Sequence, residues 1–475
     1  MTTEGSEPRP LSISRTGFFW GFWTLLGAMF VGYVWNVRPS LSPNDNARWD
    51  TIWSLVEDGT YVIEPQNRQF PTIDKVVRRH DGAVVSSKPP LLPTVAAGYV
   101  AVWRRVLGEP FSKDAPVPGK PTKPGSIHIY GKLVLIAFNV LPMLLMLWLY
   151  RRYLDRAAQT DFAWTFSLVA MGLGTLVTGY LATLNNHVVA ATWGFVAVYN
   201  LLRIWYDDRQ ERWRYALAGL LVGWTAANEL PAGLFAILAT GVLLWKNPVR
   251  CLVAFVPPLA LVAAAFFYTN FLAVGDPERP WQISNFTPAY LQKDLYQTDI
   301  DGKPSYWKAG NPDRSAIDAL NDHPEPKWLY ALHSTIGHHG LFSLSPVLLF
   351  CVWGWLLASR GRGRKDDEAA PFPLRGFAWL LGFLTAAVFC FYLFVTDQRN
   401  YGGFCHGLRW MLWLTPMWML FLPVALDGLR DRRRLPPLAW GALAVSVLSA
   451  FDALHNPWTR SWLHRILLYF NVVDY

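Results

Sequence analysis

The sequence predicts an all-α protein that crosses a membrane many times. Of its 475 residues, 52% are hydrophobic and 16% are charged, whereas an ordinary soluble protein carries about 25% charged residues. The chain is also rich in aromatic residues, with 25 Trp, 19 Tyr and 28 Phe, and such side chains are favoured where a bilayer meets water. The apolar residues form long runs separated by polar loops. These features argue against a soluble enzyme.

The apolar runs predict about 11 transmembrane helices, because about 20 residues of helix are needed to cross a hydrocarbon core of ~30 Å. The first run, residues 16–37, is not followed by a small-residue cleavage site, so we expect an uncleaved anchor with a cytoplasmic N-terminus. The other predicted spans are residues 128–150, 163–183, 187–203, 215–230, 231–246, 251–275, 341–359, 376–396, 409–429 and 436–453.

Residues 89–107 are apolar enough to span, but they begin with two prolines and end near Arg104 and Arg105. If this segment does not cross, the short basic clusters fall on the cytoplasmic side, as membrane proteins prefer; if it crosses, the later clusters lie outside. We therefore expect a helix lying along the outer face. The clusters are at residues 9–15, 151–156, 203–214, 246–250, 360–375 and 430–434.

This topology predicts one membrane domain, residues 1–454, with outer loops at 38–127 and 276–340, and an outer tail at 455–475. The loops hold too few apolar residues for a second domain of any size. The net charge of +9 resides largely in clusters between spans, so nucleic acid is not an expected partner. The four cysteines show no metal-ligand spacing.

The first outer loop opens with helix-start residues, Ser42 to Asn46, followed by apolar residues at helical spacing and by Gly59 as a stop. We predict a short amphipathic helix on the membrane surface, with Trp49 and Trp53 at the headgroup level. Asp45 would then stand at the water–lipid boundary, where it could meet a lipid-borne substrate. The alternative is that Asp45 or Asn44 only caps the helix.

Further along the loop, Lys88 precedes two prolines and an apolar segment. A lysine at a helix N-terminus on the membrane surface could hold a phosphate, together with the amide groups of the first turn. The alternative is a lysine that only reaches from the membrane to water.

These motifs resemble a known family. The series N-D-N-A-R-W-D-T-I (residues 44–52), followed by S-S-K-P-P-L-L-P (residues 86–93), is similar to integral-membrane glycosyltransferases of the GT-C fold, among them protein O-mannosyltransferases and lipid A aminoarabinose transferases. Their first loop carries D-E-x-R-Y and then E-K-P-P. Asp45, Arg48, Trp49 and Lys88 match that pattern, whereas the second acid is Asn46 here.

The resemblance implies an inverting glycosyltransferase that moves a sugar from a polyprenyl-phosphate donor to a lipid, glycan or protein acceptor. Asp45 would be the base that deprotonates the acceptor hydroxyl, and Lys88 with arginines, Arg48 among them, would bind the phosphate. It also implies a bacterial inner-membrane location with the site facing outward. No cofactor is expected. The alternatives are a transporter or flippase of lipid-linked substrates, or a non-catalytic assembly protein of the same fold.

Further polar residues stand at predicted outer turns and are candidates for substrate binding, because hydrocarbon offers them no partners. Asn186 and His187 occupy one such turn, and Glu229, a second candidate base, occupies another; each could simply be a turn residue. The glycine-rich segment 397–410, which resembles a Y-G-G-x-x-x-G-x-R-Y/W motif of similar bacterial proteins, adds Arg399, Tyr401 and Arg409.

One histidine group, His333, His338 and His339, suggests a metal only weakly. No carboxylate lies at helical spacing from it, and adjacent histidines on a helix point in different directions. The sequence therefore does not predict a metal site.

Overall fold

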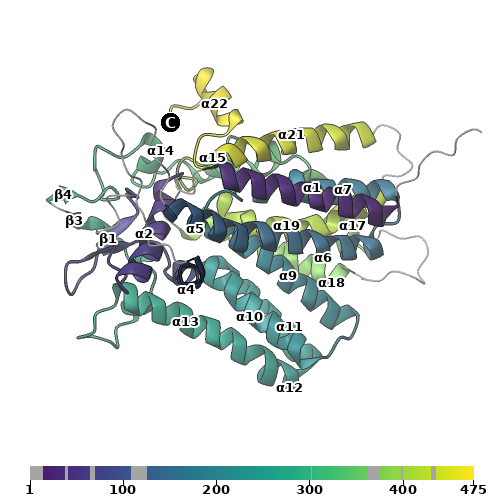
Figure 1. Cartoon of the computed structure of the whole chain (residues 1–475). Coiled ribbons are helices and arrows are strands. Elements are labelled where there is room, and N and C mark those ends of the chain that lie inside the picture. The colour runs from purple at the N-terminus through teal and green to yellow at the C-terminus, as the bar shows by residue number, and fades with distance from the viewer. Residues whose placement is uncertain are drawn as a thin grey trace, which may run out of the picture.

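The computed structural model describes residues 14–37, 41–64, 70–107, 126–300, 302–361, 374–396, 399–428 and 435–475. It is a bundle of long helices with small loops and strands gathered at one end (Figure 1). The long helices are α1 (Arg15–Asn36), α6 (Leu141–Ala157), α7 (Asp161–Leu173), α9 (Asn186–Tyr206), α10 (Arg212–Asn228), α11 (Gly233–Lys246), α13 (Val256–Val274), α17 (Leu348–Ser359), α18 (Arg375–Cys390) and α21 (Leu435–His455).

Eight helices of the described chain are long and apolar enough to cross a membrane, and some of them combine several of these elements. They are Arg15–Asn36, His128–Ala157, Asp161–Gly179, Asn186–Tyr206, Pro248–Val274, Arg375–Val395, Arg409–Asp427 and Pro436–His455. Two shorter apolar helices, Leu230–Lys246 and Leu348–Ser359, and the 17-residue α10 lie at the other predicted spans. The prediction of an all-α, multi-pass membrane protein is confirmed, while the count of about 11 stays a prediction.

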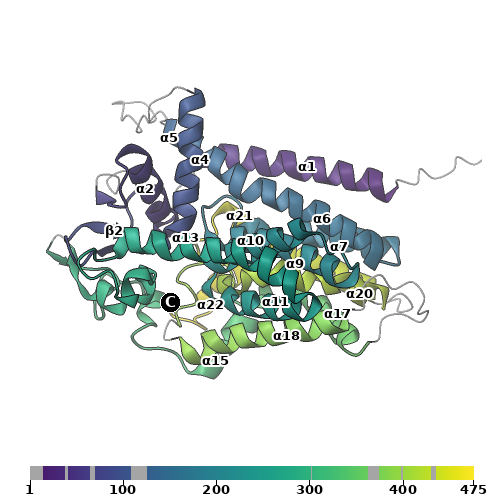
Figure 2. The same cartoon turned by 90° about the horizontal axis from the view of Figure 1, so that it is seen from below.

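The segment at 89–107 forms α4 (Leu91–Leu107), which lies across the bundle. Figure 1 shows α4 nearly end-on while α1, α6 and α13 run along the picture, and Figure 2 shows it lengthwise, crossing their direction. It packs against α2 (Pro43–Glu57), α5 (Ser126–Leu135) and α13. This is the orientation expected of a helix that lies along a membrane face.

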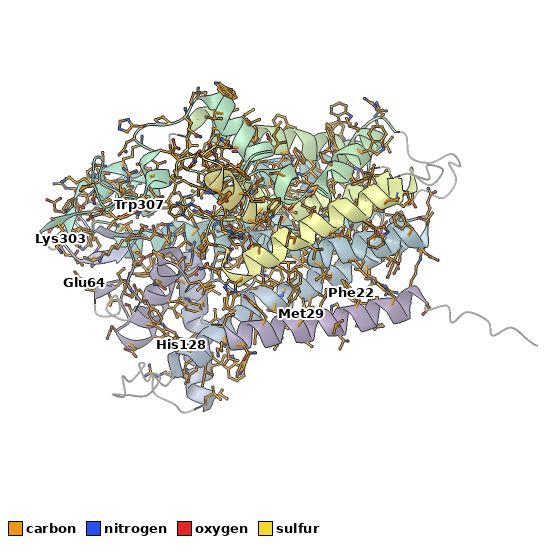
Figure 3. The ribbon with its side chains drawn as sticks, turned by 90° about the horizontal axis from the view of Figure 1, so that it is seen from above. Phe22, Met29, Glu64, His128, Lys303 and Trp307 are labelled. Atoms are coloured by element: carbon orange, nitrogen blue, oxygen red, sulfur yellow. The ribbon has the colours of Figure 1, made fainter. Side chains whose placement is uncertain are left out.

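Both long loops and the C-terminal segment lie at the same end of the bundle (Figures 1 and 2). The first loop contains α2 and a hairpin of β1 (Lys75–Val77) and β2 (Val84–Ser86), with Lys75 opposite Ser86. The second contains β3 (Asp299–Ile300), β4 (Lys303–Pro304), α14 (Ala316–Ala319) and α15 (Lys327–Thr335), and the C-terminal segment contains α22 (Trp462–Tyr469). An ion pair of 2.6 Å between the Arg79 guanidinium and the Asp294 carboxylate joins the two loops. Figure 3 shows Glu64, Lys303 and Trp307 at this end, away from Phe22 in α1.

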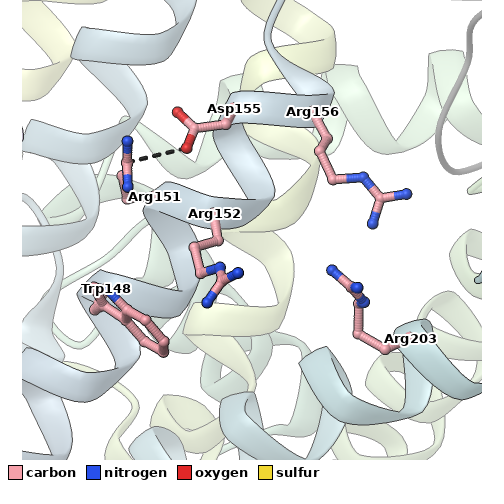
Figure 4. A pocket seen from close by; sticks show the side chains of 6 residues that line it. All are labelled: Trp148, Arg151, Arg152, Asp155, Arg156 and Arg203. Carbon is pink, nitrogen blue, oxygen red and sulfur yellow. Dashed lines mark ion pairs between the residues drawn. The ribbon is translucent and has the colours of Figure 1, made fainter. Parts of the chain in front are cut away.

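The opposite end of the bundle carries basic residues. A cavity of about 290 Å³ lies between the ends of α6 and α9, lined by Trp148, Arg151, Arg152, Asp155, Arg156 and Arg203 (Figure 4). Two of the predicted basic clusters therefore meet there, on a single side of the bundle. Arg9, residues 110–125, 362–365 and 430–434, which also entered the topology prediction, lie outside the described residues.

Helix α2 forms where predicted but is buried differently. Ser42 caps it, with Oγ accepting a hydrogen bond from the backbone N–H of Asp45 at 3.3 Å, and Gly59 follows its end at a φ of +65°. Trp49 and Trp53 are each only 1% exposed and stack on one another within the protein core. The expectation that their rings face the membrane surface was wrong, because α4 and the bundle cover the apolar stripe of α2.

Candidate functional site

Most of the predicted site residues converge at the end of the bundle that carries the loops. They come from five segments: Asp45 and Arg48 from α2, Lys88 from the approach to α4, Asn186 and His187 from the start of α9, Glu229 from the end of α10, and Arg409 from the first position of the 3-10 helix η8 (Arg409–Leu414). Helix starts and ends meet here because each segment enters or leaves the bundle at this end.

Asp45 is completely buried, with 0% of its surface exposed. Its Oδ2 accepts a hydrogen bond of 3.1 Å from the indole Nε1 of Trp458, and its Oδ1 has no hydrogen-bond partner among the described residues. Ser42, rather than Asp45 or Asn44, is the residue whose side chain caps α2, and the role of Asp45 as a base stays a prediction. Burial raises the pKa of the Asp45 carboxyl to about 8, although the nearby Arg48 charge acts in the opposite direction.

Arg48 lies one helical turn after Asn44 and is also buried. Its guanidinium donates to the backbone oxygen of Asn44 at 2.9 Å, to the side-chain oxygen of Asn44, and to Oδ1 of Asn186 at 2.6 Å. Asn186 in turn donates to the Glu229 carboxylate at 2.9 Å. The guanidinium of Arg48 is therefore held by neutral amide groups. Asn186 stands between it and the Glu229 carboxylate.

Arg409 is held by a second chain of hydrogen bonds that ends at the same carboxylate. Its Nη1 donates to Nε2 of His187 at 2.8 Å, and Nδ1 of His187 contacts Oε1 of Glu229. Because a guanidinium can only donate, His187 accepts at Nε2 and carries its proton on Nδ1, directed at Glu229. Glu229 thus orients both arginines through neutral intermediates.

The glycine-rich segment before Arg409 packs closely against the Arg409 side chain. Gly402 has a φ of +89°, and a Cβ there would collide with Nε of Arg409. Nη2 of Arg409 also donates to the backbone oxygen of Gly402 at 3.1 Å, and the guanidinium lies 5.2 Å from the ring centroid of Trp458. The absence of a side chain at Gly402 therefore lets the backbone approach the Arg409 guanidinium closely.

Lys88 is turned toward a carboxylate that the sequence reading did not select. Its Nζ lies 2.9 Å from Oδ1 of Asp74. Burial lowers the pKa of the Lys88 ammonium, and the nearby charges of Arg48 and Arg409 act in the same direction, while Asp74 opposes the change. Three cations are therefore close enough to repel one another, which creates a favourable place for an added anion.

The two guanidiniums of this group have no direct carboxylate partner in the part of the chain that is described. No ion pair joins Arg48 or Arg409 to an aspartate or glutamate there. A guanidinium that is hydrogen-bonded only to neutral groups keeps its charge available for a phosphate. The site can therefore hold an anion and, beside it, a carboxyl group with one unpartnered oxygen.

Arg399 and Tyr401 lie elsewhere. Tyr401 is buried, stacks on Tyr330 at 4.9 Å and on His339 at 4.9 Å, and donates to the Glu325 carboxylate. Arg399 lies near Tyr330, and no hydrogen bond or ion pair connects it with Arg409 within the described ranges. Tyr401 thus belongs to a cluster of aromatic and histidine side chains that includes Tyr330, His338 and His339.

Two residues of the site gave little signal in the sequence. Trp458 is 413 residues from Asp45, and nothing in its local sequence connects it with the first loop. Asp74 lies in a loop without helical or strand periodicity, directly before β1. Asn46, which replaces the second acid of the resemblance, points away and donates to the backbone oxygen of Pro71 at 2.9 Å.

No protein-family model matches the chain, and no curated protein matches it either. Among solved structures it is similar to the Archaeoglobus fulgidus oligosaccharyltransferase, with 13% identity over 93% of this chain and 53% of that chain and a TM-score of 0.46. A second structure, oligosaccharyltransferase AglB from the same organism with an inhibitory peptide and a dolichol-phosphate, has 14% identity over 94% and 56% and a TM-score of 0.43. ArnT from Cupriavidus metallidurans has 14% identity over 89% and 78% and a TM-score of 0.33.

The chain thus spans about half the length of the archaeal oligosaccharyltransferases that it matches. These proteins are membrane glycosyltransferases of the GT-C type, the type that the first-loop motifs resemble. Since the TM-scores are below 0.5, the functional argument rests on the geometry of the site.

Proposed function

We propose that this chain is an inverting glycosyltransferase that moves a sugar from a polyprenyl-phosphate donor to an acceptor hydroxyl. The observation that carries the proposal is the convergence of Arg48, Lys88 and Arg409 beside the buried carboxyl of Asp45. These groups supply what direct transfer needs, namely positive charge for the departing phosphate and a proton acceptor for the attacking hydroxyl.

The cations suit a phosphate that leaves as a stable anion. Such a leaving group needs charge stabilisation rather than a proton, and preorganised donors provide this at low reorganisation cost. Arg48 and Arg409 are preorganised by Asn186 and His187, so their guanidiniums are held in place before a donor arrives. Lys88 adds a third charge and is already balanced by Asp74 when no donor is bound.

Asp45 suits the part of the base better than Glu229 does. Glu229 already accepts hydrogen bonds from Asn186 and His187, whereas Oδ1 of Asp45 is unpartnered. Because Asp45 is fully buried and Trp458 contacts its carboxyl group, the acceptor can reach Oδ1 only when the side chains around Asp45 move.

The site would face the outer side of a bacterial inner membrane. Basic clusters are favoured on the cytoplasmic side, and the arginine cavity lies at the C-terminal end of α9, whereas the site lies at its N-terminal end. With 21 residues at ~1.5 Å each, α9 separates the two by ~30 Å, which is one hydrocarbon thickness.

Donor binding and transfer by the purified protein test the proposal. Labelled polyprenyl-phosphate sugars are incubated with wild-type protein, with Arg409→Gln, and with Arg152→Gln as a matched control from the opposite end of the bundle. We expect wild type and Arg152→Gln to bind the donor and release or transfer its sugar, and Arg409→Gln to lose binding at least tenfold, as expected for one charge-assisted contact of about 1.5–3 kcal/mol. Equal binding by Arg409→Gln and wild type would remove the phosphate assignment.

A second candidate function is a non-catalytic assembly protein that binds the lipid donor without transferring its sugar. The complete burial of Asp45 and the asparagine at position 46 favour it. It predicts donor binding that depends on Arg409, with no sugar release under any condition.

A further inference from the structure

A second cluster of chemistry-bearing side chains lies beside the proposed site, and none of the proposed steps uses it. It consists of His338 and His339, from the turn that follows α15, and His464 from α22. All three side chains are 0% exposed, although they come from distant parts of the chain. One ring nitrogen from each lies within 4.8 Å of the other two.

Two ring nitrogens of this cluster have no hydrogen-bond partner in the described part of the chain. Among the described residues, Nε2 of His339 and Nδ1 of His464 are buried and form no hydrogen bond. The Nδ1 atoms of His338 and His339 face one another at close range. Buried polar atoms normally find a partner, so three neighbouring imidazoles with two unpartnered nitrogens are candidates for binding a cation.

The outer nitrogens, by contrast, are engaged. Nε2 of His464 lies 2.5 Å from the backbone oxygen of Tyr475, and Nε2 of His338 lies 3.3 Å from the Tyr475 hydroxyl. Metal-bound histidines commonly use one nitrogen for the ion and the other for such a contact, which fixes the ring orientation. The arrangement leaves Nδ1 of His464 without a partner among the described residues and directs Nδ1 of His338 toward His339.

We propose that His338, His339 and His464 bind a first-row transition metal ion of the Zn²⁺ type. Imidazole suits zinc and its neighbours, whereas Mg²⁺ and Ca²⁺ prefer oxygen ligands, and the three residues offer only nitrogen. The expectation drawn from helical geometry does not apply, because His338 and His339 lie in a turn where adjacent rings can converge, and the third ligand comes from α22. This site shares no residue with the proposed sugar-transfer site.

The ion would fasten the C-terminal segment to the second loop. Oγ of Ser461 already donates to the backbone oxygen of His338 at 2.9 Å, so the two segments meet directly beside the cluster. The same segment carries Trp458, which contacts both Asp45 and Arg409. Metal binding would therefore stabilise the covered state of the proposed site.

Metal content of the purified full-length protein tests this inference without any sugar donor. Protein is stripped with a chelator, reloaded with Zn²⁺, freed of excess metal and analysed by elemental mass spectrometry. The variants are His464→Gln and His339→Gln, and the matched control is His455→Gln, an exposed histidine at the end of α21. We expect about one Zn²⁺ per chain in wild type and in the control, a loss in both cluster variants, and a Zn²⁺-dependent rise in Tm only where Zn²⁺ binds.

Two further outcomes keep the test decisive. Co²⁺ added to stripped wild type should produce visible d–d absorption that Zn²⁺ abolishes, and this measurement holds even if a variant fails to fold. Wild type that retains no Zn²⁺, or cluster variants that retain as much as the control, would overturn the site. Neither result bears on donor binding at Arg409, so the two proposals fail independently.

Discussion

Asp45 has surroundings that its position in the sequence does not reveal. It stands in the first turn of a helix, where an aspartate is usually a cap, yet Ser42 caps the helix and Asp45 is left with an unpartnered oxygen. Its burial raises its pKa to about 8, which places its ionisation close to physiological pH.

Substitution of Asp45 by asparagine distinguishes a role as general base from a purely structural role. We expect Asp45→Asn to fold normally, because the amide oxygen can still accept the hydrogen bond from Trp458. Sugar transfer should fall by ~10²–10⁴-fold, the usual contribution of a general base. Transfer rates and donor binding are measured together; Glu229→Gln, tested in parallel, should disturb donor binding instead. A folded Asp45→Asn protein with the wild-type rate would exclude Asp45 from the mechanism.

The pH dependence of transfer should report the same group. A base works only when it is deprotonated, and burial raises the pKa of Asp45 to about 8, so the rate should climb as the pH rises through about 8. Below that value it should fall about tenfold for each pH unit, because the ionised fraction falls by that factor. A rate profile that stays flat between about pH 6 and 9 would contradict this.

Lys88 is expected to act on the donor rather than on folding. Removing its charge in Lys88→Ala should weaken donor use by ~10–100-fold, which corresponds to one charge-assisted contact of about 1.5–3 kcal/mol. Lys88→Arg should retain part of the activity if charge alone is needed. The transfer rate is measured as a function of donor concentration. If Lys88→Ala uses the donor as well as wild type does, Lys88 only reaches from the membrane to water and pairs with Asp74.

At the scale of elements, the C-terminal segment after α21 connects the site with the rest of the molecule. It places the Trp458 ring over Arg409 and its N–H against Asp45, and it packs Trp458 edge-on against Tyr180. The segment therefore affects the site in two ways. It covers the site, and its hydrogen bond from Trp458 lowers the pKa of Asp45.

Trp458→Phe should separate these two effects. The phenyl ring keeps the packing, while the hydrogen bond that lowers the pKa of Asp45 is lost. The pKa of Asp45 should rise further, so the climbing part of the pH–rate profile should move to higher pH. A profile with an unchanged midpoint would show that Trp458 acts through packing alone.

At the scale of the whole molecule, the two ends of the bundle differ in composition. Loops with the proposed site lie at one end, and arginines with a cavity lie at the other (Figures 1 and 4). A membrane protein with this distribution should sit with the arginine end in the cytoplasm.

Cysteine labelling of intact cells tests this orientation. Single cysteines at Lys303 and at Arg209, both exposed and at opposite ends, are introduced after the native cysteines are replaced. An impermeant reagent should label Lys303→Cys and leave Arg209→Cys unlabelled until the cells are opened. The reverse pattern would invert the topology, and labelling of both would contradict a bundle that spans the membrane.

Several features were determined by the sequence because their causes are local. Long apolar runs must form helices in a membrane, since hydrocarbon offers no partner to the backbone. Helical spacing and start residues located α2, and the prolines and arginines at the borders of 89–107 indicated a helix that does not follow the others. The resemblance of the first loop also selected Asp45, Arg48 and Lys88 as candidate site residues, and the glycine-rich motif selected Arg409; their roles stay predictions.

Only the tertiary structure decided which distant groups touch. It placed Trp458 on Asp45, Asp74 on Lys88 and His464 beside His338, and it moved Tyr401 from the site to the histidine cluster. Contacts between segments far apart leave no periodic trace in either segment. The burial of Trp49 was hidden for a related reason: an apolar stripe has the same sequence whether lipid or another helix covers it, and only the packing of α4 on α2 distinguishes the two.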